Sequence, residues 1–331
     1  MSDITRIPAL PDGFVPFVPR APWWGGDLQT LRNMLVRPKS RLDEYRRQDM
    51  AFPMEDGTGD ILSGILGLPD QRRADAPLAI LVHGLTGCAD SYYMHASSLM
   101  LLRRGLPVLR LNLRGAGPSR SACREFYHAG RSADLRTVLR QLPDRLTAGG
   151  VVLVGYSLGA NLVLKLAGED LGDPVRAVAG ISAPIDLRAA SLCMMRRRNW
   201  FYHRHLVRAM RAGALAGPLD PAEADAVRAA ATCWDFDDRF VAPRHGWRGA
   251  GDYYAANSAR HFLDAIRLPT LVVHALDDPW IPGSMYRAYD WSRNPRLVPV
   301  LANGGGHVGF HGADGTTWHD QCLSRFLDRL A

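Results

Sequence analysis

Short apolar runs alternate with longer amphipathic stretches along most of this chain. Two segments, Tyr45–Met54 and Asp60–Leu68, are predicted to be strands, and the Glu55-Asp56-Gly57 sequence between them predicts a turn. Runs of four to seven mainly apolar residues then follow, and runs this short are typical of strands that are covered on both faces. They are 78–82, 107–112, 151–154, 175–181, 269–274 and 296–300.

The stretches between these runs have helical spacing. Helices are predicted over 91–104, 132–142, 158–168 and 317–330. Strands that alternate with helices imply βαβ units with right-handed crossovers. The expected fold class is therefore α/β, with a mostly parallel, doubly wound sheet.

Two intervals depart from this alternation. Residues 1–43 are rich in Pro, Trp and Gly and show little periodicity, so we expect an extended arm over the body of the protein. Residues 186–268 contain no convincing buried strand, and a further helix is predicted over 218–231. We therefore expect an α/β domain over 44–331 that carries an inserted helical cap at about 186–268.

Composition places the chain among ordinary globular proteins. Its 331 residues are 47% hydrophobic and 22% charged, and no apolar run reaches the ~18 residues that a membrane span requires. The first residues show no basic segment followed by an apolar core, so we expect no secretory signal. The five cysteines are odd in number and include no C-x-x-C pair, which favours free thiols and a cytoplasmic location.

The net charge of +7 comes almost entirely from arginine, because only Lys39 and Lys165 are lysines. No RNA- or DNA-binding motif accompanies the arginines, so we expect no nucleic-acid partner. Met194 and Met195 precede a basic stretch in the expected cap. This stretch is either a solvated helix face or a surface for weak contact with anionic lipid. Its arginines are Arg196, Arg197, Arg198, Arg204, Arg208 and Arg211.

The strongest chemical signal is Gly155-Tyr156-Ser157-Leu158-Gly159, between an apolar strand and an apolar helix. In this context G-x-S-x-G is typical of a nucleophile elbow, a sharp turn that projects the serine hydroxyl above the sheet. The alternative is a serine that only caps the helix, but a cap does not require the flanking glycines. Ser157 is therefore the candidate nucleophile.

A glycine-rich loop, His83-Gly84-Leu85-Thr86-Gly87, follows an earlier strand. In such folds one oxyanion donor comes from this loop and the other from the residue after the nucleophile. We therefore expect the backbone N–H groups of Leu85 and Leu158 to form the oxyanion hole. His83 is expected to order the loop.

Candidate partners for the serine follow the last two strands. Asp277 and Asp278 come directly after the 269–274 run, and D-x-x-I-P spacing favours Asp278. His307 lies in a glycine-rich loop after the final strand. The chain order Ser…Asp…His is the order of α/β-hydrolases.

These motifs resemble the α/β-hydrolase superfamily and, within it, the YheT-like subfamily, which is related to eukaryotic α/β-hydrolase-domain esterases and phospholipases. Further marks of the subfamily are Gly26-Asp-Leu-Gln-Thr30, Asn112-Leu-Arg-Gly-Ala116 and Tyr253-Tyr254. Asp27, Ala116 and Ala160 depart from the usual pattern without removing a catalytic group. The resemblance implies an esterase that acts on an acyl-chain or lipid ester.

We expect a carboxylic-ester hydrolase that needs no cofactor and no metal. An acyltransferase with the same triad and a catalytically idle binding module are the alternatives, and the sequence leaves the oligomeric state open. Because the expected cap lies over the active-site edge of the sheet, its apolar residues Met194 and Trp200 are the candidate substrate contacts. The alternative is that they only fill the core of the cap.

Overall fold

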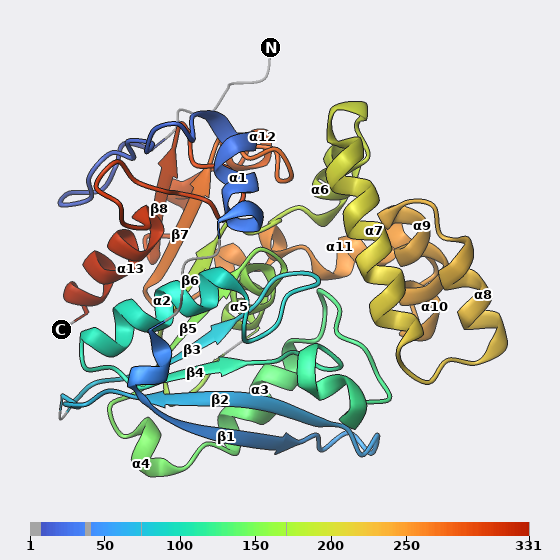
Figure 1. Cartoon of the computed structure of the whole chain (residues 1–331), viewed down its shortest axis with the longest axis horizontal. Helices are drawn as coiled ribbons and strands as arrows, with labels where there is room; N and C mark the ends of the chain where they lie inside the picture. Colours follow the sequence, from blue (N-terminus) through green and yellow to red (C-terminus); the bar gives the residue numbers. More distant parts are fainter. Residues whose placement is uncertain (1–7, 37–40, 74, 170, 331) are drawn as a thin grey trace.

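The structure, a computed structural model, describes residues 8–36, 41–73, 75–169 and 171–330. Its centre is an eight-stranded sheet in the order β1-β2-β4-β3-β5-β6-β7-β8 (Figure 1). The pairs β1–β2 and β2–β4 are antiparallel, and all other neighbours are parallel, which confirms the mostly parallel sheet. The strands are β1 (Arg46–Pro53), β2 (Ile61–Leu68), β3 (Leu78–Val82), β4 (Val108–Leu111), β5 (Val151–Tyr156), β6 (Val175–Ile181), β7 (Thr270–Ala275) and β8 (Leu297–Ala302).

Both faces of the sheet are covered by helices, as the apolar runs predicted. Along β3, Leu78 and Ile80 pack into one core and Ala79 and Leu81 into the other, because successive side chains point to opposite faces. Helices α3 (Ser132–Arg140) and α5 (Leu158–Gly168) cover the first face, and α2 (Tyr92–Arg103) and α13 (Trp318–Asp328) cover the second.

The interval between β6 and β7 forms a separate group of helices that extends to one side of the sheet (Figure 1). Residues 187–269, all of which the structure describes, contain no strand. We call them the helical segment. A capping box between Asp220 and Glu223 begins one of its helices, and a π-helical turn spans Asp237–Val241. Its helices are α6 (Leu187–Met194), α7 (Trp200–Leu215), α8 (Pro221–Ala229), α9 (Cys233–Phe236), α10 (Ala242–Arg244) and α11 (Ala250–Asn257).

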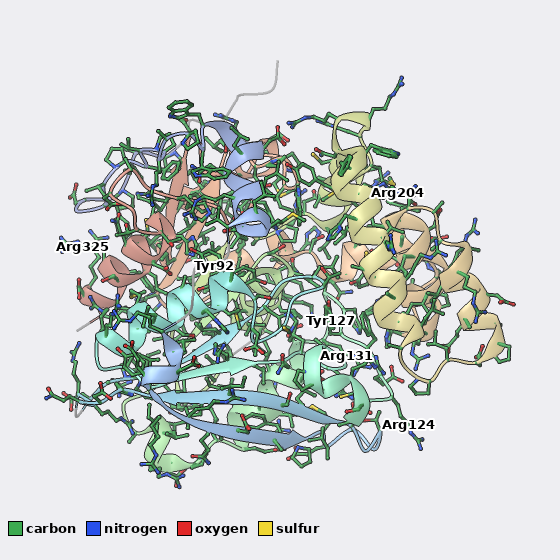
Figure 2. The ribbon with its side chains drawn as sticks, in the orientation of Figure 1. Tyr92, Arg124, Tyr127, Arg131, Arg204 and Arg325 are labelled. Atoms are coloured by element: carbon green, nitrogen blue, oxygen red, sulfur yellow. The ribbon has the colours of Figure 1, made fainter. Side chains whose placement is uncertain are left out.

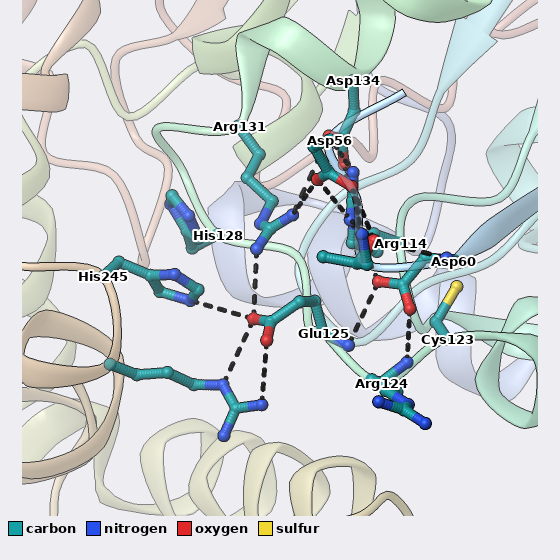
Figure 3. A network of polar contacts seen from close by, with 12 residues as sticks. Asp56, Asp60, Arg114, Cys123, Arg124, Glu125, His128, Arg131, Asp134 and His245 are labelled. Carbon is teal, nitrogen blue, oxygen red and sulfur yellow. Dashed lines mark hydrogen bonds and ion pairs between the residues drawn. The ribbon is translucent and has the colours of Figure 1, made fainter. Parts of the chain in front are cut away.

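A network of ion pairs joins the helical segment to the sheet domain (Figure 3). Glu125, in the loop before α3, accepts hydrogen bonds from Arg131 of the same loop and from Arg244 of α10, both at 3.1 Å. Nearby, the buried Arg114 binds Asp134 in a bidentate pair of 2.7 and 2.9 Å and contacts Asp60 at 3.0 Å. Arg114 belongs to the Asn112–Ala116 motif, so this motif ties the first turn of α3 to the residue before β2.

The N-terminal interval is only partly the extended arm that we expected. Residues Gly25–Leu35 form helix α1, which lies over the ends of β7 and β8 (Figure 1). The sequence hides this helix because it begins with two glycines, and Trp24 at its N-cap offers no side-chain cap. Residues 1–7 and 37–40 of the interval lie outside the described part of the chain.

Candidate active site

Ser157 lies at the turn between β5 and α5 with φ 52° and ψ −120°. A non-glycine residue rarely adopts a positive φ, and such strain is typical of functional positions. The flanking glycines make the turn possible. A Cβ on Gly155 would overlap the carbonyl oxygen of Gly159, and a Cβ on Gly159 would overlap that of Val82. The turn at Ser157 therefore depends on close backbone contacts between β5, the first turn of α5 and the end of β3.

His307 and Asp278 meet Ser157 from the loops after β8 and β7. The Nε2 atom of His307 lies 2.9 Å from the Oγ of Ser157, and its Nδ1 lies 2.8 Å from the Oδ2 of Asp278. Both partners are buried, and the indole of Trp280 stacks on the imidazole at a centroid distance of 4.5 Å. The three groups converge because the carboxyl ends of parallel strands share one edge of the sheet.

The two neighbouring aspartates have different partners. The second oxygen of Asp278, Oδ1, accepts hydrogen bonds from the backbone N–H groups of Trp280 (2.8 Å) and Ile281 (3.0 Å). Asp277 instead accepts from the backbone N–H of Gly306 at 3.0 Å. Burial raises the pKa of Asp277. The structure thus pairs His307 with Asp278, the aspartate that the D-x-x-I-P spacing favoured.

The His83–Gly87 loop lies directly against the nucleophile, since a Cβ on Gly84 would come 2.9 Å from the Cβ of Ser157. His83 holds the loop in place: its Nδ1 pairs with the carbonyl of Gly84 at 2.8 Å, and its Nε2 accepts from the N–H of Leu113 at 3.0 Å. Burial lowers the pKa of His83 to about 4, so its ring is neutral at pH 7.

The two amides expected to form the oxyanion hole lie beside Ser157. The N–H of Leu158 is in the first turn of α5, where no intrahelical acceptor exists. Leu85 lines the same cavities as Ser157. Its backbone N–H donates no hydrogen bond to any residue in the described part of the chain. Both donors are therefore available to a substrate.

A family model described as the alpha/beta hydrolase fold matches residues 77–314. The chain belongs to this family. It is 31% identical over 314 residues to YheT of Escherichia coli (strain K12), whose name marks it as an unconfirmed esterase. That match covers 92% of this chain and 89% of YheT.

A second relative, from Saccharomyces cerevisiae, is named medium-chain fatty acid ethyl ester synthase/esterase 2. It is 26% identical over 80% of this chain, which spans 64% of that longer protein. Among solved structures, the esterase Pf2001 of Pyrococcus furiosus matches with a TM-score of 0.58 at 15% identity, covering 96% of this chain and 97% of the other. This last likeness concerns the fold alone.

Two cavities of this hydrolase meet at Ser157. One is a wide cleft of about 1210 Å³ and the other a narrow pocket of about 120 Å³. Leu85, Ser157, Leu206 and Trp280 line both of them. The narrow pocket is mainly apolar and lies between the sheet domain and helices α6, α7, α9 and α11.

The two candidate substrate contacts have different surroundings. Met194, at the end of α6, is buried and lines the narrow pocket together with Met210. The expectation for Trp200 was wrong: this side chain is 58% exposed at the start of α7 and lines neither cavity. It lies on the solvent face of its helix, against Phe201 and beneath Arg204.

Helix α1 positions the histidine loop, a role that the sequence motif did not reveal. Thr30 accepts a hydrogen bond from the backbone N–H of His307 at 2.8 Å and donates to the carbonyl of Gly26 at 2.7 Å. Gln29 is fully buried and accepts from the N–H of His311 at 2.7 Å. The Gly26–Thr30 motif therefore fixes the backbone on both sides of the loop that carries the imidazole.

No cluster of three or more His, Cys, Asp or Glu side chains in the described part of the chain is arranged to hold a metal ion. His311 contacts Asn33 and Arg32 of α1, and His203 accepts from the N–H of Cys233. These histidines therefore have structural partners.

Proposed function

We propose that this protein is a serine hydrolase that cleaves carboxylic esters through an acyl-enzyme. The observation that carries the proposal is the hydrogen-bonded chain from Ser157 through His307 to Asp278, at the junction of two cavities. One cavity is of a size to hold an acyl group and the other leaves room for the departing alcohol. The membership of this protein in an esterase- and lipase-like family supports the same conclusion.

In the first half-reaction, Ser157 attacks the ester carbonyl and His307 takes up its proton. Asp278 holds the imidazole in the tautomer that can accept this proton and stabilises the imidazolium. The N–H groups of Leu85 and Leu158 donate to the oxyanion of the tetrahedral intermediate. Losing one such donor raises the barrier by about 3–4 kcal/mol in related chemistry. His307 then returns the proton to the leaving alkoxide, and the acyl group remains on Ser157.

In the second half-reaction, water enters from the wide cleft and gives its proton to His307. The resulting hydroxide attacks the acyl-enzyme carbonyl. The new tetrahedral intermediate collapses, the free acid leaves, and Ser157 recovers its proton from the imidazolium.

The narrow pocket limits the length of the acyl group. Its volume of about 120 Å³ is close to the ~150 Å³ of an apolar cavity that holds benzene, so a chain of roughly six carbons would fill it. Each buried methylene contributes about 0.8 kcal/mol, or roughly a fourfold rise in kcat/KM. We expect kcat/KM for p-nitrophenyl esters to rise stepwise from acetyl to hexanoyl and then level off.

Two variants of α6 test this pocket. Met194→Ala enlarges the pocket and is expected to move the optimum to longer chains. Leu192→Ala, two positions earlier on the exposed side of the same helix, is expected to leave the optimum unchanged. The same length profile for all three proteins would show that the acyl group binds elsewhere.

Labelling with a fluorophosphonate probe tests the central proposal. The wild-type protein and the exposed Ser284→Ala control are expected to react with the probe and to hydrolyse p-nitrophenyl butyrate. Ser157→Ala is expected to lose both activities while keeping its melting temperature. A wild-type protein that does not react would instead indicate a catalytically idle binding module.

Acyl transfer to an alcohol is the second candidate, favoured by the name of the yeast relative and by the size of the wide cleft. In this reaction an alcohol replaces water, its proton passes to His307, and a new ester leaves. Product analysis with ethanol present separates the two activities. Ethyl ester in excess of free acid at low ethanol concentration identifies a transferase, and free acid alone identifies a hydrolase.

A further inference from the structure

One part of the helical segment carries a positive charge equal to the net charge of the whole protein. Residues 187–219 contain seven arginines and neither Asp nor Glu. Taking these seven from the 40 Lys and Arg of the chain leaves 33, which equals its 33 Asp and Glu. The remainder of the molecule is therefore formally neutral. The seven are Arg188, Arg196, Arg197, Arg198, Arg204, Arg208 and Arg211.

Most of these arginines are free to meet an external anion. Arg196, Arg197, Arg204 and Arg208 are all exposed. Within the described ranges, the only ion pair formed by any of the seven joins Arg198 to Asp27 of α1, at 2.8 Å. Figure 2 shows Arg204 on α7, in the part of the molecule that extends away from the sheet.

Large apolar side chains are exposed in the same place. Phe201 and Trp200, at the start of α7, are 78% and 58% exposed and contact each other edge to face. Leu192 of the neighbouring α6 is exposed as well. Adjacent exposed aromatic residues are rare on a protein that does not use them, because each keeps a large apolar area in water.

Helix α1 continues this apolar surface. Trp24, Leu28 and Leu35 are exposed, and their spacing places them on one face of the helix. Asp27 joins α1 to the start of α7 by its ion pair with Arg198 and a hydrogen bond of 3.1 Å from Tyr202. Exposed residues of α1 and its N-cap, of α6, of the turn that follows α6 and of the start of α7 together form what we call the α1–α7 surface. They are Trp24, Leu28, Leu35, Leu192, Arg196, Arg197, Trp200, Phe201 and Arg204.

This surface lies beside the opening of the wide cleft. Asn33 and Met34 of α1 line the cleft, as do His205 and Leu206 of α7. A partner bound to the α1–α7 surface would therefore lie next to the entrance that leads to Ser157.

We propose that the α1–α7 surface docks the protein on an anionic lipid membrane, with the cleft entrance facing the bilayer. Arginines attract the anionic headgroups, and Trp and Phe insert at the interface between headgroups and acyl chains. A lipid surface fits better than a nucleic acid, because the exposed leucines have no counterpart in base stacking. The docked geometry would let an ester enter the cleft directly from the membrane.

Vesicle sedimentation tests the proposal without any turnover, so its outcome is independent of the proposed esterase activity. The wild-type protein is expected to bind vesicles of phosphatidylglycerol and phosphatidylcholine at least tenfold more tightly than vesicles of phosphatidylcholine alone. Phe201→Ser is expected to weaken binding to the anionic vesicles at least threefold with no change in charge. Arg196→Glu/Arg197→Glu is expected to weaken it at least tenfold.

A matched control removes the same charge elsewhere. Arg46→Glu/Arg296→Glu replaces two exposed arginines of the sheet domain and is expected to reduce binding less than threefold. All variants should keep the wild-type melting temperature and the wild-type rate on soluble p-nitrophenyl acetate.

Three outcomes would overturn the proposal. The first is the absence of anionic vesicle binding by the wild-type protein. The second is an equal loss in the control and the Arg196/Arg197 variants, which would indicate a general charge effect. The third is tighter binding of single-stranded RNA than of vesicles with the same dependence on Arg196 and Arg197, which would identify a nucleic-acid surface.

Discussion

Replacing Asp278 with asparagine changes the proton position on His307. The Oδ1 atom of Asp278 accepts two backbone N–H groups, so the asparagine carbonyl oxygen must take that place. The new NH₂ group then faces the Nδ1 of His307, 2.8 Å away in the wild type. Because two donors cannot face each other, the imidazole carries its proton on Nε2, which points at Ser157.

An imidazole in this tautomer cannot accept the serine proton. The corresponding substitution in serine proteases lowers kcat about 10⁴-fold, which equals about 5.5 kcal/mol of barrier. Flipping the amide would restore the base but would leave two backbone N–H groups facing an NH₂ donor, at about 1–3 kcal/mol for each unsatisfied group. We therefore expect Asp278→Asn to lose about four orders of magnitude in kcat.

The assay is hydrolysis of p-nitrophenyl butyrate, with a melting temperature measured for each protein. Asp277→Asn is the matched control and is expected to stay within about threefold of wild type. Its asparagine oxygen can still accept from the N–H of Gly306. An Asp278→Asn variant that keeps a tenth of the wild-type kcat, or an Asp277→Asn variant that is equally impaired, would refute the tautomer argument.

Three further predictions concern buried contacts. Arg114→Ala leaves buried carboxylates unpaired, so it should lower the free energy of unfolding by about 3–5 kcal/mol in urea titrations, whereas exposed Arg248→Ala should cost under about 1 kcal/mol. Equal losses would contradict this assignment. Thr30→Val removes the acceptor for the His307 N–H and should lower kcat roughly tenfold, with Thr30→Ser restoring it; an unchanged kcat in the valine variant would show that α1 does not position the loop. Burial raises the pKa of Asp320 from 3.8 to about 7, so the folded state keeps this proton longer and stability falls as pH rises from about 4 to about 7. Asp320→Asn should become more stable than wild type across this window, and parallel melting-temperature profiles would count against the shift.

Much of the fold could be predicted from local pattern. The run Leu78–Val82 was expected as a strand and is β3, because a strand with both faces buried must be apolar throughout. The 151–154 run was predicted two residues short. The strand continues through Gly155 and Tyr156 to the turn at Ser157, where apolar content no longer marks its end.

The candidate site was also visible in the sequence, because each of its residues follows a strand. In the sheet, β7 and β8 are neighbours, and only β6 lies between β5 and β7. Residues that follow β5, β7 and β8 therefore meet at one edge of the sheet, and these are Ser157, Asp278 and His307. The spacing distinguished Asp278 from Asp277 before any contact was known. Motif and topology agree here because the chemistry requires both.

What the sequence determined by itself is therefore the alternation of strands and helices, the three candidate site residues at strand ends and the lack of strands over about 186–268. Only the tertiary structure decided which apolar residues face a cavity: Met194 lines the narrow pocket, whereas Trp200 points to solvent. Likewise, only the tertiary structure shows that residues 25–35 form a helix and that this helix holds the His307 loop, because the segment has no N-cap side chain that would mark its start. Local pattern reports how a segment folds, but the side of a helix that is covered depends on neighbours distant in the chain, and these contacts leave no local trace.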